Sequence, residues 1–159
     1  MHTESTLMEV FESTPPSYSP DELAKIANDY FGKTGTIKTL VSERDQNARL
    51  ITGNGDYVLK IANRAEDPEV LEFQNAVLNH IAELDPSLAV PAVIKGAAGQ
   101  EIFKHGENYV RLITFLKGDI FGDSKKSLNL YGDLGHFMGR FSKAMQGFGH
   151  VKAHQPDFL

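Results

Sequence analysis

The sequence has no cysteine, which excludes disulfide bonds, thiolate metal ligands and cysteine nucleophiles and gives no reason to expect an oxidising compartment. It is also short of positive charge, because 16 Lys and Arg residues stand against 21 Asp and Glu residues and the net charge is -5. This balance argues against a general nucleic-acid binder. No apolar run approaches the roughly 20 residues that span a bilayer, and the N-terminus lacks the basic start of a signal peptide. We therefore expect a cytoplasmic protein.

What the sequence does contain is the composition of an ordinary globular domain, with 41% hydrophobic and 23% charged residues. Its 159 residues suit one domain, or one domain and part of another. A chain of this length buries roughly 68–70% of its unfolded surface, so its fold requires no disulfide or metal. The sequence contains no internal repeat and no low-complexity segment.

The first part of the chain predicts a polar arm followed by a helix. Residues 1–17 are mostly polar and include a Pro-Pro pair, so we expect a mobile or loosely held arm. Ser19 is a suitable N-cap, Pro20 suits the first helical position, and acidic residues follow. Apolar residues then recur at helical spacing as far as Phe31, and Gly32 is a suitable end for the helix.

The next signal is a β-hairpin that carries a lysine. Asn54-Gly55 lies between apolar segments and predicts a type I′ turn, because both residue types tolerate positive φ angles. Lys60 lies near the end of the second strand, and a helix with an apolar face follows at 67–84. Kinases bind phosphate with a strand lysine followed by such a helix. The alternative is a lysine that is only solvated, which is the commoner case on a half-exposed strand.

The rest of the chain predicts further strands and a final helix. Strand candidates lie at 36–41, 90–94, 102–103 and 109–116, and the last is apolar on both faces toward its end. A helix with an apolar stripe covers about 130–145. Because strands and helices do not alternate, we expect an α+β fold. Its antiparallel sheet would have about five strands, with one helix packed on it and one helix near each end of the chain.

Four segments together resemble the aminoglycoside phosphotransferase and choline kinase superfamily, which are small-molecule kinases with the protein-kinase-like fold. Residues 41–47 resemble the nucleotide loop between the first two strands, although they are alternatively an ordinary polar connection. Residues 57–63 resemble the third strand with its ATP-binding lysine, 72–78 the helix that partners this lysine, and 109–118 the strand entering the interlobe hinge. The combination and its order are more specific than any one segment. The nearest likeness is to the hydroxylysine-kinase-like branch, which includes bacterial versions fused to class III aminotransferases.

The resemblance implies a nucleotide site and names its candidate residues. Lys60 would bind the α- and β-phosphates as a point charge, and the backbone N–H and hydroxyl of Ser42 would cover the phosphates. The adenine would bond to the backbone of Thr114 and Leu116. The position that usually partners the lysine falls on Gln74, which can accept a hydrogen bond from Lys60 but supplies no charge.

Several polar residues near these candidates receive no binding role. Glu72 lies roughly 200° around the helix from Gln74, so the two cannot share a face, and we expect Glu72 to be solvated. Arg111 alternates away from the hinge residues, and we expect it on the solvent face or in a structural ion pair. His150 and His154 lack a third ligand, so they do not predict a zinc site.

The resemblance covers residues 20–159 and stops before the family's catalytic machinery. We expect residues 1–17 to be the arm, 18–117 the N-terminal lobe, and 118–159 the hinge exit and first helical part of an incomplete C-terminal lobe. The family's His-x-Asp catalytic loop, its metal-binding Asn and its later metal-binding Asp have no counterpart here. We therefore assign no catalytic and no metal-binding residue.

We expect this chain to be the ATP-binding lobe of a small-molecule O-phosphotransferase and to be inactive by itself. The parent protein would transfer the γ-phosphate of ATP or GTP to a hydroxyl of an aminoglycoside, amino alcohol or hydroxy-amino acid, with Mg²⁺ held by the missing lobe. The alternative is a pseudokinase-like docking or regulatory domain of a larger, aminotransferase-fused protein. A His-x-Asp-x₄-Asn motif beyond Leu159 would favour catalysis. Because the stripe at 131–145 lacks its covering lobe, we expect an exposed apolar patch and self-association.

Overall fold

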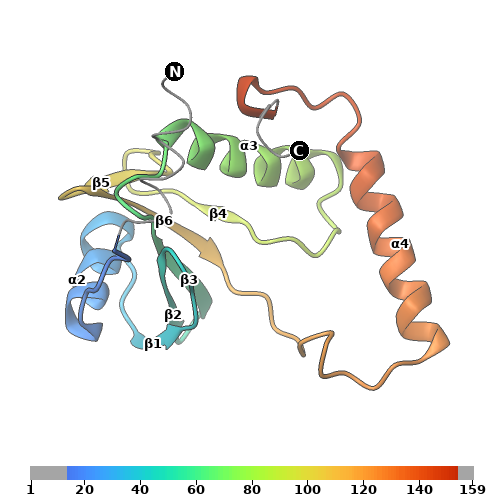
Figure 1. Ribbon diagram of the computed structural model, residues 1–159, viewed down its shortest axis with the longest axis horizontal. Helices are drawn as coiled ribbons and strands as arrows, with labels where there is room; N and C mark the ends of the chain where they lie inside the picture. The colour runs from blue at the N-terminus through green and yellow to red at the C-terminus, as the bar shows by residue number, and fades with distance from the viewer. Residues whose placement is uncertain (1–13, 154–159) are drawn as a thin grey trace.

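The computed structural model describes residues 14–153, and the structural statements below refer to these residues. An antiparallel sheet forms the centre of the structure, helix α2 packs on one of its faces, and helices α3 and α4 lie on the other side (Figure 1). This is the α+β arrangement predicted from the sequence. The first thirteen residues of the predicted arm lie outside the described part. Within that part, no helix has the length and apolar character needed to cross a bilayer.

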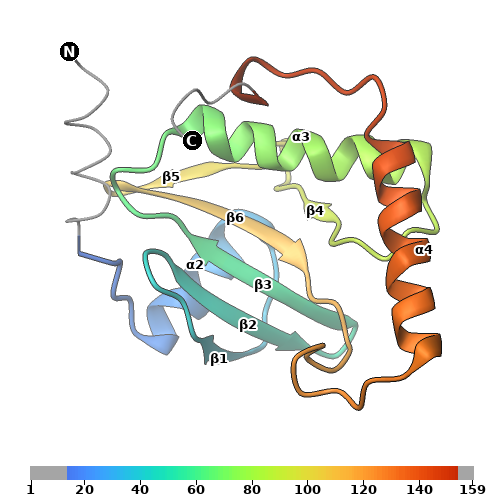
Figure 2. The same ribbon diagram turned by 45° about the vertical axis from the view of Figure 1, so that its right-hand side comes forward.

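The sheet has the strand order β1-β2-β3-β6-β4, and β5 also pairs with β6. The short strands β4 and β5 follow one another along the edge of β6 that β3 leaves free (Figure 2). Six strands therefore form five rows, which reconciles the sheet with the prediction of about five strands. The elements are α2 Pro20–Phe31, β1 Thr36–Leu40, β2 Gln46–Thr52, β3 Gly55–Ile61, α3 Pro68–Leu84, β4 Val93–Ile94, β5 Phe103–His105, β6 Asn108–Thr114, α4 Leu128–Ala144 and the short 3₁₀ helix η1 Val151–Ala153.

Local sequence sets both ends of α2, as predicted. The Ser19 side chain accepts the N–H of Glu22, and the Glu22 carboxylate accepts the N–H of Ser19 at 2.7 Å, which closes a capping box. Pro20 begins the helix, and Gly32 ends it at a φ of +62°, a conformation that strains L side chains. The helix buries one face against the sheet through Leu23, Ile26, Ala27 and Phe31.

Ser19→Ala is expected to lower the free energy of unfolding by about 1 kcal/mol, because it removes the acceptor for the Glu22 N–H. Urea denaturation followed by circular dichroism would show a lower midpoint with an unchanged slope. Ser17→Ala is the matched control, since Ser17 is exposed and precedes the cap. It should change the stability by less than about 0.5 kcal/mol. Equal losses in the two variants would contradict the capping role.

The hairpin is confirmed, but the predicted type I′ turn is wrong. Thr52 pairs with Gly55, so the two turn residues are Gly53 and Asn54. A type I′ turn needs positive φ at both central residues, and in this turn only Gly55 has a positive φ, of +131°. The Thr52 hydroxyl instead accepts the Asn54 N–H at 3.2 Å and donates to the Gly55 carbonyl. A side-chain turn at Thr52 therefore replaces the backbone geometry that Asn54-Gly55 suggested.

Side chains alternate along the strands and give the sheet one apolar and one polar face. The apolar face lies under α2 and forms the main core with the fully buried side chains Ala48, Leu50, Leu59, Ile61, Val110 and Leu112. Lys60 and Arg111 alternate with these residues and therefore point to the opposite face. The polar face, defined here by Asn47, Lys60 and Arg111, is the side of the sheet on which α3 lies.

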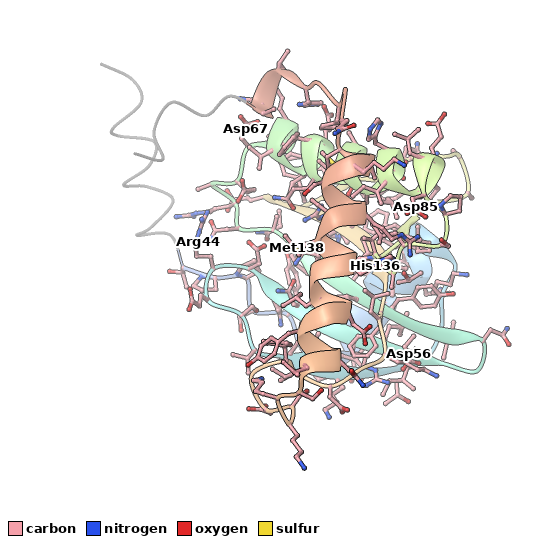
Figure 3. The ribbon with its side chains drawn as sticks, turned by 90° about the vertical axis from the view of Figure 1, so that its right-hand side faces the viewer. Arg44, Asp56, Asp67, Asp85, His136 and Met138 are labelled. Atoms are coloured by element: carbon pink, nitrogen blue, oxygen red, sulfur yellow. The ribbon has the colours of Figure 1, made fainter. Side chains whose placement is uncertain are left out.

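Helix α4 follows a long connection from β6 and stands beside the C-terminal end of α3 (Figures 1 and 3). Phe137 and Phe141 of α4 pack on the cluster around Ile81 of α3. Arg140 Nε donates to the carboxylate of Asp85, the C-cap of α3, at 2.9 Å. The exposed apolar patch expected at 131–145 is present only in part, because other residues of that stripe, such as Phe137, pack on the cluster around Ile81. The exposed patch on α4 consists of Leu128, Tyr131, Leu134 and Met138.

Candidate functional site

Lys60 is the centre of the polar face. Its side chain is half-buried, and Nζ donates to Asn47 Oδ1, directly across the β2–β3 pair, at 3.1 Å. It forms no ion pair with a carboxylate in the described part of the chain. Burial lowers the pKa of Lys60, the neighbouring Arg111 lowers it further, and Asp45 opposes the shift. Lys60 is thus a partly desolvated cation with a neutral partner, which suits it to bind an anion.

Arg111 lies beside Lys60, because the two residues are directly paired between β3 and β6. Of the two expectations for Arg111, the solvent face is wrong, since only 6% of its surface is exposed, and no ion pair of Arg111 is found among residues 14–153. Its guanidinium donates to Asn75 Oδ1 at 3.1 Å and to Gln74 Oε1. Burial lowers the pKa of Arg111, although Asp45 and Glu66 oppose the shift. Alternation along β6 separates Arg111 from the hinge residue Thr114, but the position of Arg111 opposite Lys60 depends on the register between β3 and β6.

The position of Gln74 differs from the prediction in its partner. Gln74 lies on the face of α3 that points to the sheet, as expected, but it accepts its hydrogen bond from Arg111. Lys60 turns toward β2 and uses Asn47 instead. Helix α3 therefore contacts the polar face through the arginine of β6, one strand farther from the loop than the lysine. Glu72 is exposed on the far side of the helix, as predicted.

The loop 41–45, between β1 and β2, is fastened to the chain that follows β3. The Ser42 hydroxyl donates to the Asp45 carbonyl at 2.7 Å, and the Asp45 carboxylate accepts the Asn63 N–H at 3.0 Å. The amide of Asn63, which has no exposed surface, donates to the Arg44 carbonyl at 3.2 Å. The candidate Ser42 hydroxyl is thus already engaged within its own loop. Sequence reading missed Asn63, whose role depends on contacts across the sheet edge.

This loop borders an open pocket of about 370 Å³. The pocket wall also includes Asn47, the partner of Lys60, and Glu66 from the segment before α3. Burial raises the pKa of the Glu66 carboxyl, and Arg44, which pairs with it at 3.4 Å, opposes the rise. Arg44 is labelled in Figure 3 near this end of the sheet. The pocket therefore adjoins the polar face at the end where Lys60 lies.

The hinge candidates lie at the other end of β6. The Thr114 N–H donates to the Ala92 carbonyl at 2.9 Å, and its hydroxyl accepts the Ala92 N–H at 2.8 Å. These bonds hold the end of β6 against the segment before β4. Leu116, two residues later, is exposed, and its N–H makes no backbone hydrogen bond within residues 14–153. The Leu116 N–H is therefore available to a ligand, while the Thr114 N–H is not.

Solved structures match this fold. Amicoumacin kinase hAmiN in complex with AMP-PNP, Ca²⁺ and Ami matches with a TM-score of 0.66 and 13% identity over 95% of this chain and 44% of that one. Spectinomycin phosphotransferase APH(9)-Ia, in complex with ADP and spectinomycin, matches with a TM-score of 0.64 and 8% identity over 79% of this chain and 38% of that one. A microcompartment-associated aminopropanol kinase matches with a TM-score of 0.58 and 14% identity over 85% of this chain and 43% of that one. The chain thus spans less than half the length of these proteins.

The family comparison covers more of the sequence than any motif. No curated protein matches the chain significantly. The model of the phosphotransferase enzyme family matches residues 36–159, which include loop 41–45, Lys60, all of α3 and Arg111. The match therefore spans every element of the candidate site. The chain belongs to the phosphotransferase enzyme family, the aminoglycoside phosphotransferase group that its motifs resemble.

Proposed function

We propose that this chain is the nucleotide-binding lobe of a small-molecule kinase, with residues 18–117 as the lobe and 118–159 as the start of a second lobe. The observation that supports this best is Lys60, a half-buried ammonium whose hydrogen-bond partner is the neutral amide of Asn47. A desolvated cation without a counter-ion lowers stability, and such groups are typical of binding sites. In a phosphotransferase, the natural counter-ion is the phosphate chain of a nucleotide.

The proposed nucleotide lies along the polar face, between the loop and the hinge. Lys60 neutralises the α- and β-phosphates, and the backbone N–H of Ser42 covers them because its hydroxyl is engaged within the loop. The adenine accepts a hydrogen bond from the Leu116 N–H and donates one to the Thr114 carbonyl. Gln74 contributes through Arg111 instead of through the lysine. Phosphoryl transfer depends chiefly on such positioning and charge neutralisation.

We propose ATP as the phosphate donor. The hAmiN complex contains AMP-PNP and the spectinomycin phosphotransferase complex contains ADP, and both are adenine nucleotides. GTP, the alternative expected from the sequence, has no such support. Between residues 14 and 153, no three His, Asp or Glu side chains are grouped closely enough to hold a metal ion. The proposed Mg²⁺ site lies in another part of the full protein, as the family resemblance implies, and no step proposed for this chain depends on it.

The full reaction would transfer the γ-phosphoryl group of ATP to a hydroxyl of a small molecule. The compared kinases are named for amicoumacin, spectinomycin and aminopropanol, so we keep the acceptor as an aminoglycoside, an amino alcohol or a hydroxy-amino acid. The chain by itself would bind nucleotide without catalysing transfer, because the family's catalytic loop has no counterpart in it. We place the full protein in the cytoplasm.

The second candidate function is a docking or regulatory domain. The observation that favours it is the exposed apolar patch on α4, in which Leu128 is 89% exposed and Tyr131 and Met138 are 51% exposed. Such a patch also supports self-association of the chain at high concentration. The two functions differ in one respect that can be measured, because a docking domain does not need Lys60.

Lys60→Met is expected to weaken ATP binding by about 10- to 100-fold, the usual loss for one charge-assisted hydrogen bond to a phosphate. Methionine keeps most of the side-chain volume, so the packing around position 60 on the polar face is largely retained. Titration calorimetry with ATP on the 159-residue chain measures the change. Wild-type protein that binds no ATP at millimolar concentration would contradict the proposed function.

Lys38→Met is the matched control for this experiment. Lys38 lies on β1 of the same sheet and is exposed, so its loss removes the same charge from a position outside the site. The control should bind ATP within about twofold of wild type. If Lys60→Met also binds like wild type, the docking function is favoured and the nucleotide-binding proposal is wrong.

A further inference from the structure

Lys60 and Arg111 place two positive charges side by side on the polar face. They are direct partners across β3 and β6, so their Cβ atoms lie roughly 5 Å apart. Arg111 is the deeper of the two, with 6% of its surface exposed, while the half-buried Lys60 reaches toward β2. Burial lowers the pKa of both groups, and Arg111 lowers that of Lys60 further. This arrangement is unfavourable unless an anion joins it.

Every hydrogen-bond acceptor of these two side chains in the described residues is a neutral amide. Lys60 donates to Asn47, and Arg111 donates to Gln74 and Asn75. Neither cation forms an ion pair with a carboxylate in that part of the chain. Amide oxygens fix the direction of the donors without neutralising them. Both charges therefore remain for a ligand to neutralise.

The carboxylates nearest to this pair are committed to other groups. Asp45 and Glu66 both act on the charge of Arg111 without contacting it. The Asp45 carboxylate accepts the Asn63 N–H at 3.0 Å, and Glu66 pairs with Arg44 at 3.4 Å. Neither of these carboxylates therefore contacts Lys60 or Arg111.

We propose that Arg111 is a fixed second charge of the phosphate site, held beneath Lys60 by Gln74 and Asn75, and that this pair selects ligands with two or more adjacent phosphate groups. The inference rests on the proposed nucleotide-binding function and extends it to two positioning residues of α3. A neutral residue is required at position 74, because a carboxylate there would pair with Arg111 and remove the second charge. Two fixed charges match a diphosphate or triphosphate better than a monophosphate.

Wild-type protein tests the selectivity without any substitution. Inorganic pyrophosphate and orthophosphate compete against a fluorescent ADP analogue bound to the 159-residue chain. Pyrophosphate should displace the analogue at a concentration at least about tenfold lower than orthophosphate. Equal potency of the two anions would overturn the inference, since a single charge at Lys60 would then account for binding.

Gln74→Glu tests the role of the neutral amide. It keeps the guanidinium and adds a partner for it, so the fold is retained more safely than in Arg111→Gln, which leaves buried groups unpaired. ATP and ADP affinity should fall about tenfold, while AMP affinity should stay within about twofold. Ala82→Glu is the matched control, because it adds the same charge at an exposed position of α3, eight residues along. It should leave all three affinities unchanged.

The outcomes separate this inference from the proposed function. If Lys60→Met weakens ATP binding and Gln74→Glu does not, or if Gln74→Glu weakens AMP as much as ATP, only the role of Arg111 is wrong. If Lys60→Met has no effect, the nucleotide site itself is wrong. A thermal melt of each variant identifies misfolded protein. If Gln74→Glu melts early, the pyrophosphate competition in wild-type protein decides the question.

Discussion

Asn63→Ala is expected to lower the free energy of unfolding by about 3 kcal/mol and to weaken ATP binding. Asn63 has no exposed surface, and its side chain forms hydrogen bonds to backbone groups. Nδ2 donates to the Arg44 carbonyl at 3.2 Å, and Oδ1 accepts the Ala65 N–H at 3.0 Å. Alanine leaves both partners unsatisfied, and each costs about 1–3 kcal/mol where it stays buried. The loop 41–45 also loses one of its contacts with the segment after β3, while its other contacts with that segment remain.

Urea denaturation measures the loss of stability, and titration with ATP measures the effect on the site. The backbone N–H of Asn63 still donates to Asp45 in the variant, so the loop is loosened but not released. Asn54→Ala is the matched control, because Asn54 lies in an exposed turn and only its backbone N–H bonds to Thr52. It should change the stability by less than about 0.5 kcal/mol. A loss below 1 kcal/mol in Asn63→Ala would show that the loop is held by other contacts.

The parts of the structure that the sequence predicts well are those determined by neighbouring residues. Ser19, Glu22 and Gly32 fix both ends of α2 through contacts a few residues long. The Asp67 side chain likewise caps α3 by accepting the Glu69 N–H. Alternation along β3 and β6 also separates core from polar positions. These features depend on residues close together in the chain, so a single sequence is enough to predict them.

The parts that escaped prediction depend on how distant segments meet. Arg111 lies opposite Lys60 only because β3 and β6 pair in one register, and a shift by one residue would send it to the other face. Gln74 was expected to meet Lys60, but α3 crosses the sheet closer to β6. Asn63 joins a loop eighteen residues away in sequence. The candidate site is assembled from such non-local contacts, so the sequence alone did not indicate that Arg111 and Asn63 belong to it.

Strand β3 shows how the chain divides stability from function along a single element. Its alternating positions place Leu59 and Ile61 in the core and Lys60 on the polar face. The lysine does not help to hold the strand in place, because burial lowers its pKa and thus disfavours its charged form in the folded state. At pH values below the lowered pKa, the buried charge of Lys60 reduces the free energy of unfolding. This reduction disappears as the pH rises from the lowered pKa toward the ordinary value of 10.5.

Adjacent substitutions in β3 should therefore have opposite consequences. Leu59→Ala is expected to lower the free energy of unfolding by about 3–4 kcal/mol. The Leu59 side chain is fully buried in the core under α2, and its truncation leaves a cavity. Lys60→Met should unfold at the same or a higher urea concentration than wild type at neutral pH, while it loses ATP affinity. Leu59→Ala should keep its ATP affinity wherever it remains folded.

Urea denaturation and ATP titration of the same two proteins give both quantities. Leu84→Ala is the matched truncation control, since Leu84 is 56% exposed at the end of α3 and should lose less than about 0.5 kcal/mol. If Lys60→Met were as destabilised as Leu59→Ala, the lysine would be a structural residue of the sheet, and its missing counter-ion would say nothing about a ligand. If the two variants behave as expected, one face of β3 stabilises the fold through Leu59 and the other face presents the unneutralised charge of Lys60. A phosphate-binding lobe requires this arrangement.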